Sequence, residues 1–144
     1  MDTLVVCPKC KAVNRVGLLH ADQAQPICGK CKTELTVHEG VQELTAATLT
    51  VLVKKSSRPV VIDFWAPWCG PCRSFAPVYQ KVARELAGKF VLAKLNTEAF
   101  PAAGDSFQIK GIPTMVVFKN GVEVARQSGA MPLPALMSYL KQFS

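Results

Sequence analysis

Residues 60–72 have the sequence VVIDFWAPWCGPC, which joins an apolar run to two closely spaced cysteines. Its apolar first part, residues 60–66, predicts a strand buried on both faces of a sheet. Cys69 and Cys72 follow where this strand meets a predicted helix. A helix that begins at Cys69 directs unpaired backbone N–H groups and the positive end of its dipole at that sulfur, which favours the thiolate. Since residues i and i+3 share a helix face, Cys72 lies beside Cys69 and can resolve a mixed disulfide.

The alternative for this pair is two buried structural cysteines or half of a metal site. A metal site needs further ligands, and residues 41–144 contain no other cysteine and no histidine. Pro71 suits the first turn of a helix, where its missing N–H costs no hydrogen bond. The pattern therefore favours a redox-active dithiol.

The rest of residues 41–144 alternates between helix and strand signals, which indicates an α/β domain. Thr45 is placed to cap a first helix that ends before Pro59, and Asn120-Gly121 is a strong signal for a two-residue hairpin turn. The remaining predicted elements are a helix after the cysteines with Pro77 inside it, a strand over 90–95, a short helix over 100–107, hairpin strands over 114–119 and 122–128, and a last helix opened by Pro132 and Pro134.

Residues 1–40 form a separate, smaller unit in this reading, with a boundary near Gly40. The segment is too short to build an adequate core by itself and needs a covalent or metal staple. Two Cys-x-x-Cys pairs separated by 17 residues suit a four-thiolate zinc site, which fills a tetrahedral shell and is structural. The expected ligands are Cys7, Cys10, Cys28 and Cys31.

Two alternatives remain open for these four cysteines: two further redox dithiols, or an iron–sulfur cluster. His20 and His38 exceed the ligand count and are expected to be ordinary surface residues. The N-terminus has no basic region followed by a long apolar run, so no signal peptide is expected, and a cytoplasmic location follows as the default. In that reducing compartment structural disulfides are improbable.

Charge and hydropathy limit the possible partners. The net charge is +7, but residues 1–40 contain five Lys or Arg against four acidic residues, so only +1 belongs to the cysteine-rich segment. A nucleic-acid-binding ribbon should concentrate its positive charge there. No apolar run approaches the roughly 20 residues that span a bilayer. We therefore expect no nucleic-acid partner and no membrane partner.

Residues 60–72 resemble the active-site segment of the thioredoxin family, and further matching motifs follow in the expected order. The resemblance covers residues 41–144, and the four-cysteine segment before it makes the whole chain similar to the bacterial thioredoxin 2 type. It implies a thioredoxin fold, with a central mixed sheet flanked by helices, preceded by a small zinc ribbon. The further motifs are Lys94-Leu95-Asn96, Gly111-Ile112-Pro113-Thr114, Phe118-Lys119-Asn120-Gly121 and Ser128-Gly129-Ala130.

Asp63 is the second candidate catalytic residue. A carboxylate within an apolar strand is desolvated, which raises its pKa and makes it a possible base. The alternative is a strand-end carboxylate held by backbone N–H groups. The resemblance implies that Asp63 accepts a proton to help Cys72 attack and that Lys94, on the neighbouring strand, tunes it. For Lys94 the alternative is a simply solvated lysine.

The resemblance also implies a docking surface for an extended substrate peptide beside a cis proline at Pro113. Trp68 is expected to be partly exposed, because Trp65 already faces the interior. The implied surface is flat and mostly apolar. It consists of Trp68, Gly70, Pro71, Ile112, Pro113, Gly129 and Ala130.

These expectations together predict a thiol–disulfide oxidoreductase that reduces protein disulfides. The resemblance implies that thioredoxin reductase, drawing on NADPH, restores the dithiol, and that one structural zinc ion is bound with no organic cofactor. A monomer is expected. A disulfide oxidase or isomerase is disfavoured by Gly70-Pro71, which matches reductases of this superfamily. An alternative of another class is a redox-sensing interaction module, in which oxidation of the ribbon releases zinc.

Overall fold

The computed structural model describes residues 2–17, 25–37 and 40–144 of the chain. His20 and His38 lie outside the described residues, so the expectation that they are ordinary surface residues stays a prediction. The strands are β1 Asp2–Val6, β2 Val13–Gly17, β3 Gln42–Leu44, β4 Val60–Trp65, β5 Val91–Asn96, β6 Thr114–Lys119 and β7 Val122–Ser128. The helices are α2 Ala46–Lys55, α3 Gly70–Glu85, α4 Pro101–Ser106 and α5 Leu133–Lys141.

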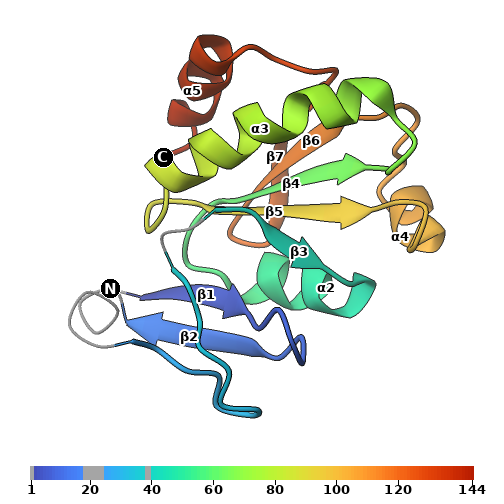
Figure 1. The fold of residues 1–144 in the computed structure, drawn as a ribbon. Coiled ribbons are helices and arrows are strands. Elements are labelled where there is room, and N and C mark those ends of the chain that lie inside the picture. Colours follow the sequence, from blue (N-terminus) through green and yellow to red (C-terminus); the bar gives the residue numbers. More distant parts are fainter. Residues whose placement is uncertain (1, 18–24, 38–39) are drawn as a thin grey trace.

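A mixed five-stranded sheet forms the centre of the molecule, in the order β3-β5-β4-β6-β7 (Figure 1). β3, β5 and β4 run parallel, whereas β6 and β7 are antiparallel to their neighbours. β4 therefore lies in the middle, and its burial on both faces explains its apolar sequence. The expected α/β fold with a mixed central sheet is confirmed.

Helices cover both faces of this sheet. Alternate residues of the central strands pack on one side against α2 and the aromatic residues that flank α4, Phe100 and Phe107, and on the other side against α3 and α5. Val61 contacts the α3 side and Ile62 the α2 side, as the two-residue period of a strand requires. Asp63 follows the parity of Val61, so its side chain lies on the face that α3 covers.

Local signals in the sequence determine several element ends. Thr45 caps α2 and forms a reciprocal capping box with Thr48. Asn120 and Gly121 have φ angles of 54° and 81°, the left-handed conformation that a tight turn between β6 and β7 requires. None of the described helices is both long and apolar enough to cross a bilayer.

The N-terminal unit is a two-stranded antiparallel hairpin, β1–β2, beneath the α2 side of the main sheet (Figure 1). Leu4 and Val6 belong to the same apolar cluster as the strands of the main sheet. The Gln42 side chain links the two parts, because its Oε1 accepts from Val6 N–H at 2.6 Å and its Nε2 donates to Leu4 C=O at 3.0 Å. The amide of Gln42 thus supplies the hydrogen bonds that a neighbouring strand would otherwise make with β1.

Replacing Gln42 by leucine should loosen this attachment. The change leaves a backbone N–H and a backbone C=O of β1 without their partners, so we expect the free energy of unfolding to fall by about 1 to 2 kcal/mol. Amide hydrogen exchange should quicken most at Val6. The exposed neighbour Glu43, replaced by glutamine, is the control, and equal exchange at Val6 in both variants would contradict the role of Gln42.

Candidate active site and metal centre

Cys69 and Cys72 lie at the start of α3, in the loop that leaves the carboxyl end of β4. Cys69 is the N-cap residue, and its Sγ accepts the backbone N–H of Cys72 at 3.2 Å. The two sulfurs form a disulfide, and the Cα atoms are 5.2 Å apart. Pro71 occupies the first turn of the helix, as its ring favours. The pair therefore has the positions needed both to bond to each other and to receive donors from the helix end.

The loop before β6 approaches Cys69 from the other side. The Ile112–Pro113 peptide bond is cis, and Ile112 C=O lies 3.8 Å from Cys69 Sγ. Gly129 N–H donates to Pro113 C=O at 2.8 Å, which brings the end of β7 to the same place. These contacts bring together the residues that the sequence places up to 60 positions apart.

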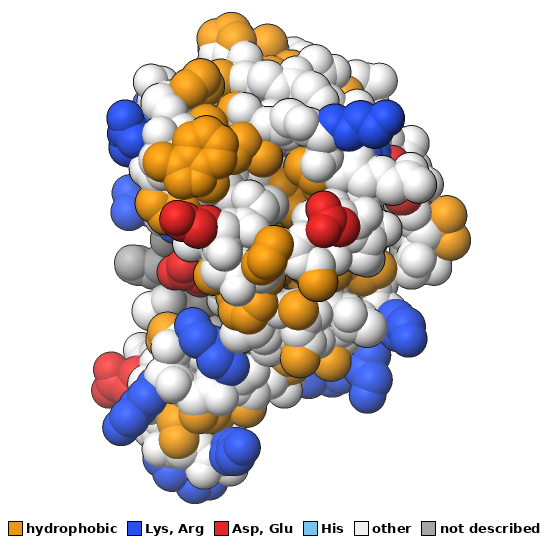
Figure 2. Space-filling model, turned by 90° about the vertical axis from the view of Figure 1, so that its right-hand side faces the viewer, with side chains coloured by type: hydrophobic (Ala, Val, Ile, Leu, Met, Phe, Trp, Pro, Cys, Tyr) orange, Lys and Arg blue, Asp and Glu red, His pale blue; other side chains and the backbone are white. Residues whose placement is uncertain are grey.

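The side chains around the dithiol form a mostly open surface. Trp68 is 67 % exposed, in agreement with the expectation that it lies at the surface. Gly70, Pro71, Gly129 and Ala130 are also exposed, Ile112 is half-buried, and Pro113 is buried beneath them. Figure 2 shows hydrophobic side chains gathered on the face that carries the β4–α3 loop and α4, with charged side chains around them.

Asp63 is buried, with 4 % of its surface exposed. Its Oδ1 has no hydrogen-bond partner among the described residues, which disfavours the alternative of a carboxylate held by backbone N–H groups. Burial raises the pKa of Asp63 to about 7, although the charge of Lys94 acts in the opposite direction. A carboxyl group with this pKa can accept and release a proton near neutral pH.

Lys94 lies on β5 directly in register with Asp63 on β4. Its Nζ is 4.8 Å from the centroid of the Trp65 ring, a distance at which a cation is attracted to the ring face. The lysine is therefore not simply solvated. Its charge is held beside the carboxyl group by the strand register and by the aromatic ring.

Asp63, Cys72 and Lys94 line one cavity of about 330 Å³ between the sheet and α3. Tyr79, which the sequence analysis did not single out, lines it as well and is fully buried. Its hydroxyl lies 2.8 Å from Ala93 C=O and 3.0 Å from Val61 C=O. The signal for Tyr79 was its position seven residues after Cys72, which places both on one helix face.

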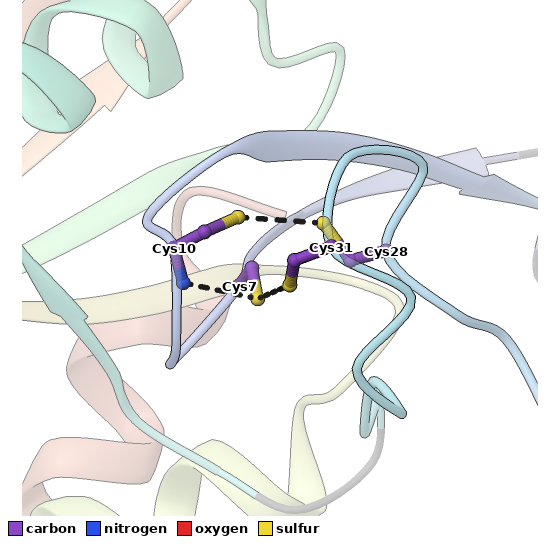
Figure 3. Close-up of side chains that lie close together, drawn as sticks. All are labelled: Cys7, Cys10, Cys28 and Cys31. Atoms are coloured by element: carbon purple, nitrogen blue, oxygen red, sulfur yellow. Dashed lines mark hydrogen bonds between the residues drawn. The ribbon is translucent and has the colours of Figure 1, made fainter.

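The four remaining cysteines lie together in the N-terminal unit (Figure 3). All four sulfurs are within 4.8 Å of one another, and both Cys7–Cys31 and Cys10–Cys28 are 3.6 Å apart. Four sulfurs at about 2.3 Å from a tetrahedrally coordinated zinc ion lie about 3.8 Å from each other. The donor set and its spacing therefore fit a metal ion of this kind.

The two cysteine pairs have the same backbone geometry. Lys11 N–H donates to Cys7 C=O and Lys32 N–H donates to Cys28 C=O, both at 3.0 Å, and both lysines have a φ of 66°. Backbone N–H groups of Cys31 and Lys30 lower the pKa of Cys28 to about 6, which favours the thiolate form of this one cysteine. These two turns therefore repeat one structure.

The comparisons agree with this geometry. The thioredoxin family model matches residues 40–142. Thioredoxin C-3 of Corynebacterium nephridii is 38 % identical over 139 residues, which are 96 % of this chain and 94 % of that protein. The thioredoxin of Haemophilus influenzae is 40 % identical over 102 residues, 71 % of this chain and 95 % of that protein. The chain spans 62 % of the length of the chloroplastic M-type thioredoxin of Spinacia oleracea, at 39 % identity.

Replacing Asp63 by asparagine should stabilise the protein in a pH-dependent way. A carboxyl group whose pKa rises from 3.8 to about 7 on folding lowers the free energy of unfolding by up to about 4 kcal/mol above pH 7. Below pH 3.8 the group is neutral in both states, so the cost disappears. We expect the variant to be about 2 to 4 kcal/mol more stable at pH 8 and equal to the parent near pH 3.

Urea unfolding at pH 8, 6 and 3 measures this difference. The exposed Asp105, replaced by asparagine, is the control and should show no comparable trend. A stability difference that does not change with pH would contradict the assignment of the raised pKa to Asp63.

Proposed function

We propose that this chain, which belongs to the thioredoxin family, reduces disulfides of other proteins with Cys69 as the attacking sulfur and Cys72 as the resolving sulfur. As a member of that family the chain is a thiol–disulfide oxidoreductase and an enzyme. The observation that carries the proposal is the position of the dithiol, because Cys69 caps α3 while Cys72 lines the cavity that contains Asp63.

The reaction begins with the thiolate of Cys69, which attacks one sulfur of the substrate disulfide and forms a mixed disulfide. The backbone N–H of Cys72 and the helix end favour this thiolate. Cys72 then transfers its proton to the Asp63 carboxylate and attacks Cys69. The Cys69–Cys72 bond forms, the bond to the substrate breaks, and the substrate leaves as a dithiol after it takes up two protons in all.

Lys94 acts on this step through Asp63. Its positive charge favours the carboxylate, and burial disfavours it, so the two effects together set how strong a base Asp63 is. Lys94 is accordingly a positioning residue in this scheme.

The substrate docks on the surface around Trp68 and the cis peptide of Ile112–Pro113. An extended peptide can pair with the backbone beside Pro113, and its own disulfide then lies next to Cys69. The exposed apolar surface of Trp68 supports this assignment. The full surface is Trp68, Gly70, Pro71, Ile112, Pro113, Gly129 and Ala130.

The oxidised chain is restored by thioredoxin reductase with electrons from NADPH, and this chain needs no organic cofactor. The short Gly70-Pro71 sequence between the cysteines supports a reductant over an oxidase. Several relatives are named thioredoxins, which supports the same direction of electron flow.

One zinc ion is held by Cys7, Cys10, Cys28 and Cys31 and is structural, since four sulfurs complete a tetrahedral shell. The ion would supply the staple that the short N-terminal unit needs. We place the domain boundary near residue 40, so that residues 1–40 form the zinc ribbon and 41–144 the thioredoxin domain. The start of the family match at residue 40 supports this boundary.

The chain works in the cytoplasm as a monomer, and neither a nucleic acid nor a membrane is its partner. Its partners are proteins with disulfides and the reductase. The net charge of only +1 on residues 1–40 supports the absence of a nucleic-acid partner. Cysteines that bind a metal stay reduced, and a reducing compartment such as the cytoplasm favours that state.

Serine at either active-site position should separate the two roles. Cys69→Ser should abolish the reduction of insulin disulfides in an assay coupled to NADPH and thioredoxin reductase. Cys72→Ser should retain the first attack and accumulate a mixed disulfide that mass spectrometry detects. Ser106→Ala, at the exposed end of α4, is the control. Undiminished turnover in either cysteine variant would refute the assigned roles.

Metal analysis tests the ribbon. The purified reduced chain should contain one zinc per molecule, and Cys28→Ser should lose it while Cys69→Ser retains it. Because metal binding contributes about 10 to 16 kcal/mol in zinc-finger peptides, its removal should abolish amide protection in β1 and β2. Iron in place of zinc, or a chain that binds no metal with its thiols intact, would contradict the proposal.

A further inference from the structure

The wall of the Asp63 cavity includes two residues that the scheme above does not use. Val41 and Gln80 line the cavity of about 330 Å³ together with Asp63 and Cys72. Val41 N–H donates to Gln80 Oε1 at 3.3 Å. Gln80 is eight residues after Cys72 on α3, so the two side chains lie on one helix face about two turns apart. The chain before β3 is thus joined to α3 across the edge of the cavity.

Gly40 lets this contact form. Its φ is +120°, a backbone conformation that is strained for any residue with a side chain. A Cβ at this position would overlap Gln80 Nε2 and lie 2.6 Å from Gln80 Cδ. The backbone of Gly40 therefore packs directly against the amide of Gln80.

The segment is also held from its other side. Gln42, the next residue after Val41, binds the backbone of β1 through both atoms of its amide. Residues 40–42 consequently lie fixed between α3 and the N-terminal hairpin. A wall held at both edges limits the access of water to Asp63 from this side of the cavity.

We propose that the contact of Gln80 with Gly40 and Val41 closes one side of the partly open cavity beside Asp63 and makes Gln80 and Gly40 positioning residues for proton transfer from Cys72. The inference rests on the proposed role of Asp63 as the base. Neither Gln80 nor Gly40 touches the reacting sulfurs. Both act through the solvation of the carboxyl group.

The charges around Asp63 explain why its solvation matters. The titratable and charged residues that line the cavity with Asp63 are Cys72, Arg73 and Tyr79 of α3 and Lys94 of β5.

On β6 the residue in register with Asp63 is the apolar Met115. Glu43 of β3 is exposed and is in register with Lys94, on the edge of β5 opposite to β4. Lys94 lowers the pKa of Asp63, so its value of about 7 depends on burial exceeding that charge.

Additional water in contact with the Asp63 carboxyl group would change this balance. A better solvated carboxylate has a lower pKa and is a weaker base. The transfer of the Cys72 proton to Asp63 would then be less favourable, and the attack of Cys72 on Cys69 would slow. The attack of Cys69 on the substrate comes earlier and does not use Asp63, so its rate should stay the same.

Gln80→Ala tests the proposal in the full-length reduced chain with its metal. Carboxyl ¹³C NMR should show the Asp63 titration midpoint about one pH unit below that of the parent. Decay of a preformed mixed disulfide should slow by about three- to tenfold above pH 7. The rate at which iodoacetamide alkylates Cys69 should not change. Gln127→Ala, on the exposed face of β7, is the matched control and should behave as the parent.

Gly40→Ala provides an independent route to the same effect, because its Cβ displaces the Gln80 amide. It should lower the Asp63 midpoint as Gln80→Ala does, and the double variant should shift it little further. The expected shift of the Asp63 midpoint is about one pH unit. A midpoint within about 0.3 pH units of the parent in both single variants would therefore overturn the proposal.

The same experiments separate this inference from the proposed function. If Asp63→Asn resolves the mixed disulfide as fast as the parent, Asp63 is not the base and the proposed mechanism fails. The titration midpoints of the Asp63 carboxyl group still decide whether the contact of Gln80 with residues 40 and 41 closes this side of the cavity.

Discussion

The packing of α3 on the sheet is the constraint on which the rest of this molecule depends. The apolar side of the helix, which includes Phe75, Tyr79 and Val82, is buried against the central strands. This packing fixes the N-terminus of α3 at the carboxyl end of β4, where Cys69 takes the cap position. The same helix covers Asp63 and removes it from water. The cap position of Cys69 and the raised pKa of Asp63, about 7, thus have one physical origin.

The burial of Asp63 is a structural cost that the active site retains. A charged carboxylate in an apolar cavity destabilises the folded state at neutral pH, whereas the sheet could accommodate an apolar residue at that position. The lysine in register and the aromatic ring of Trp65 reduce the cost without removing it. In the proposed mechanism, stability and catalysis therefore make opposite demands on this one strand position.

The N-terminal unit is closely joined to the larger fold. Leu4 and Val6 share an apolar cluster with the main sheet, and Gln42 binds the backbone of β1. The N-terminal unit thus has an apolar cluster of its own around the cysteines and also contributes Leu4 and Val6 to the core of the main sheet. The four cysteines lie in two turns with matching backbone hydrogen bonds. They belong to an apolar cluster distinct from the one that contains Leu4 and Val6.

Local sequence determined the elements and the chemistry of this protein. Thr45, Asn120-Gly121 and the apolar runs over 60–66 and 90–95 predict a helix cap, the hairpin and the buried strands, because these depend on residues close in the chain. The cysteine spacings predict a dithiol and a metal centre for the same reason. The family resemblance implied that Lys94 lies on the strand beside Asp63 and that Ile112 lies near Cys69, whereas the packing of residue 40 against Gln80 is visible in the three-dimensional structure alone. Such contacts depend on strand order and helix placement, which arise from the burial of distant surfaces and leave no periodic signal in the sequence.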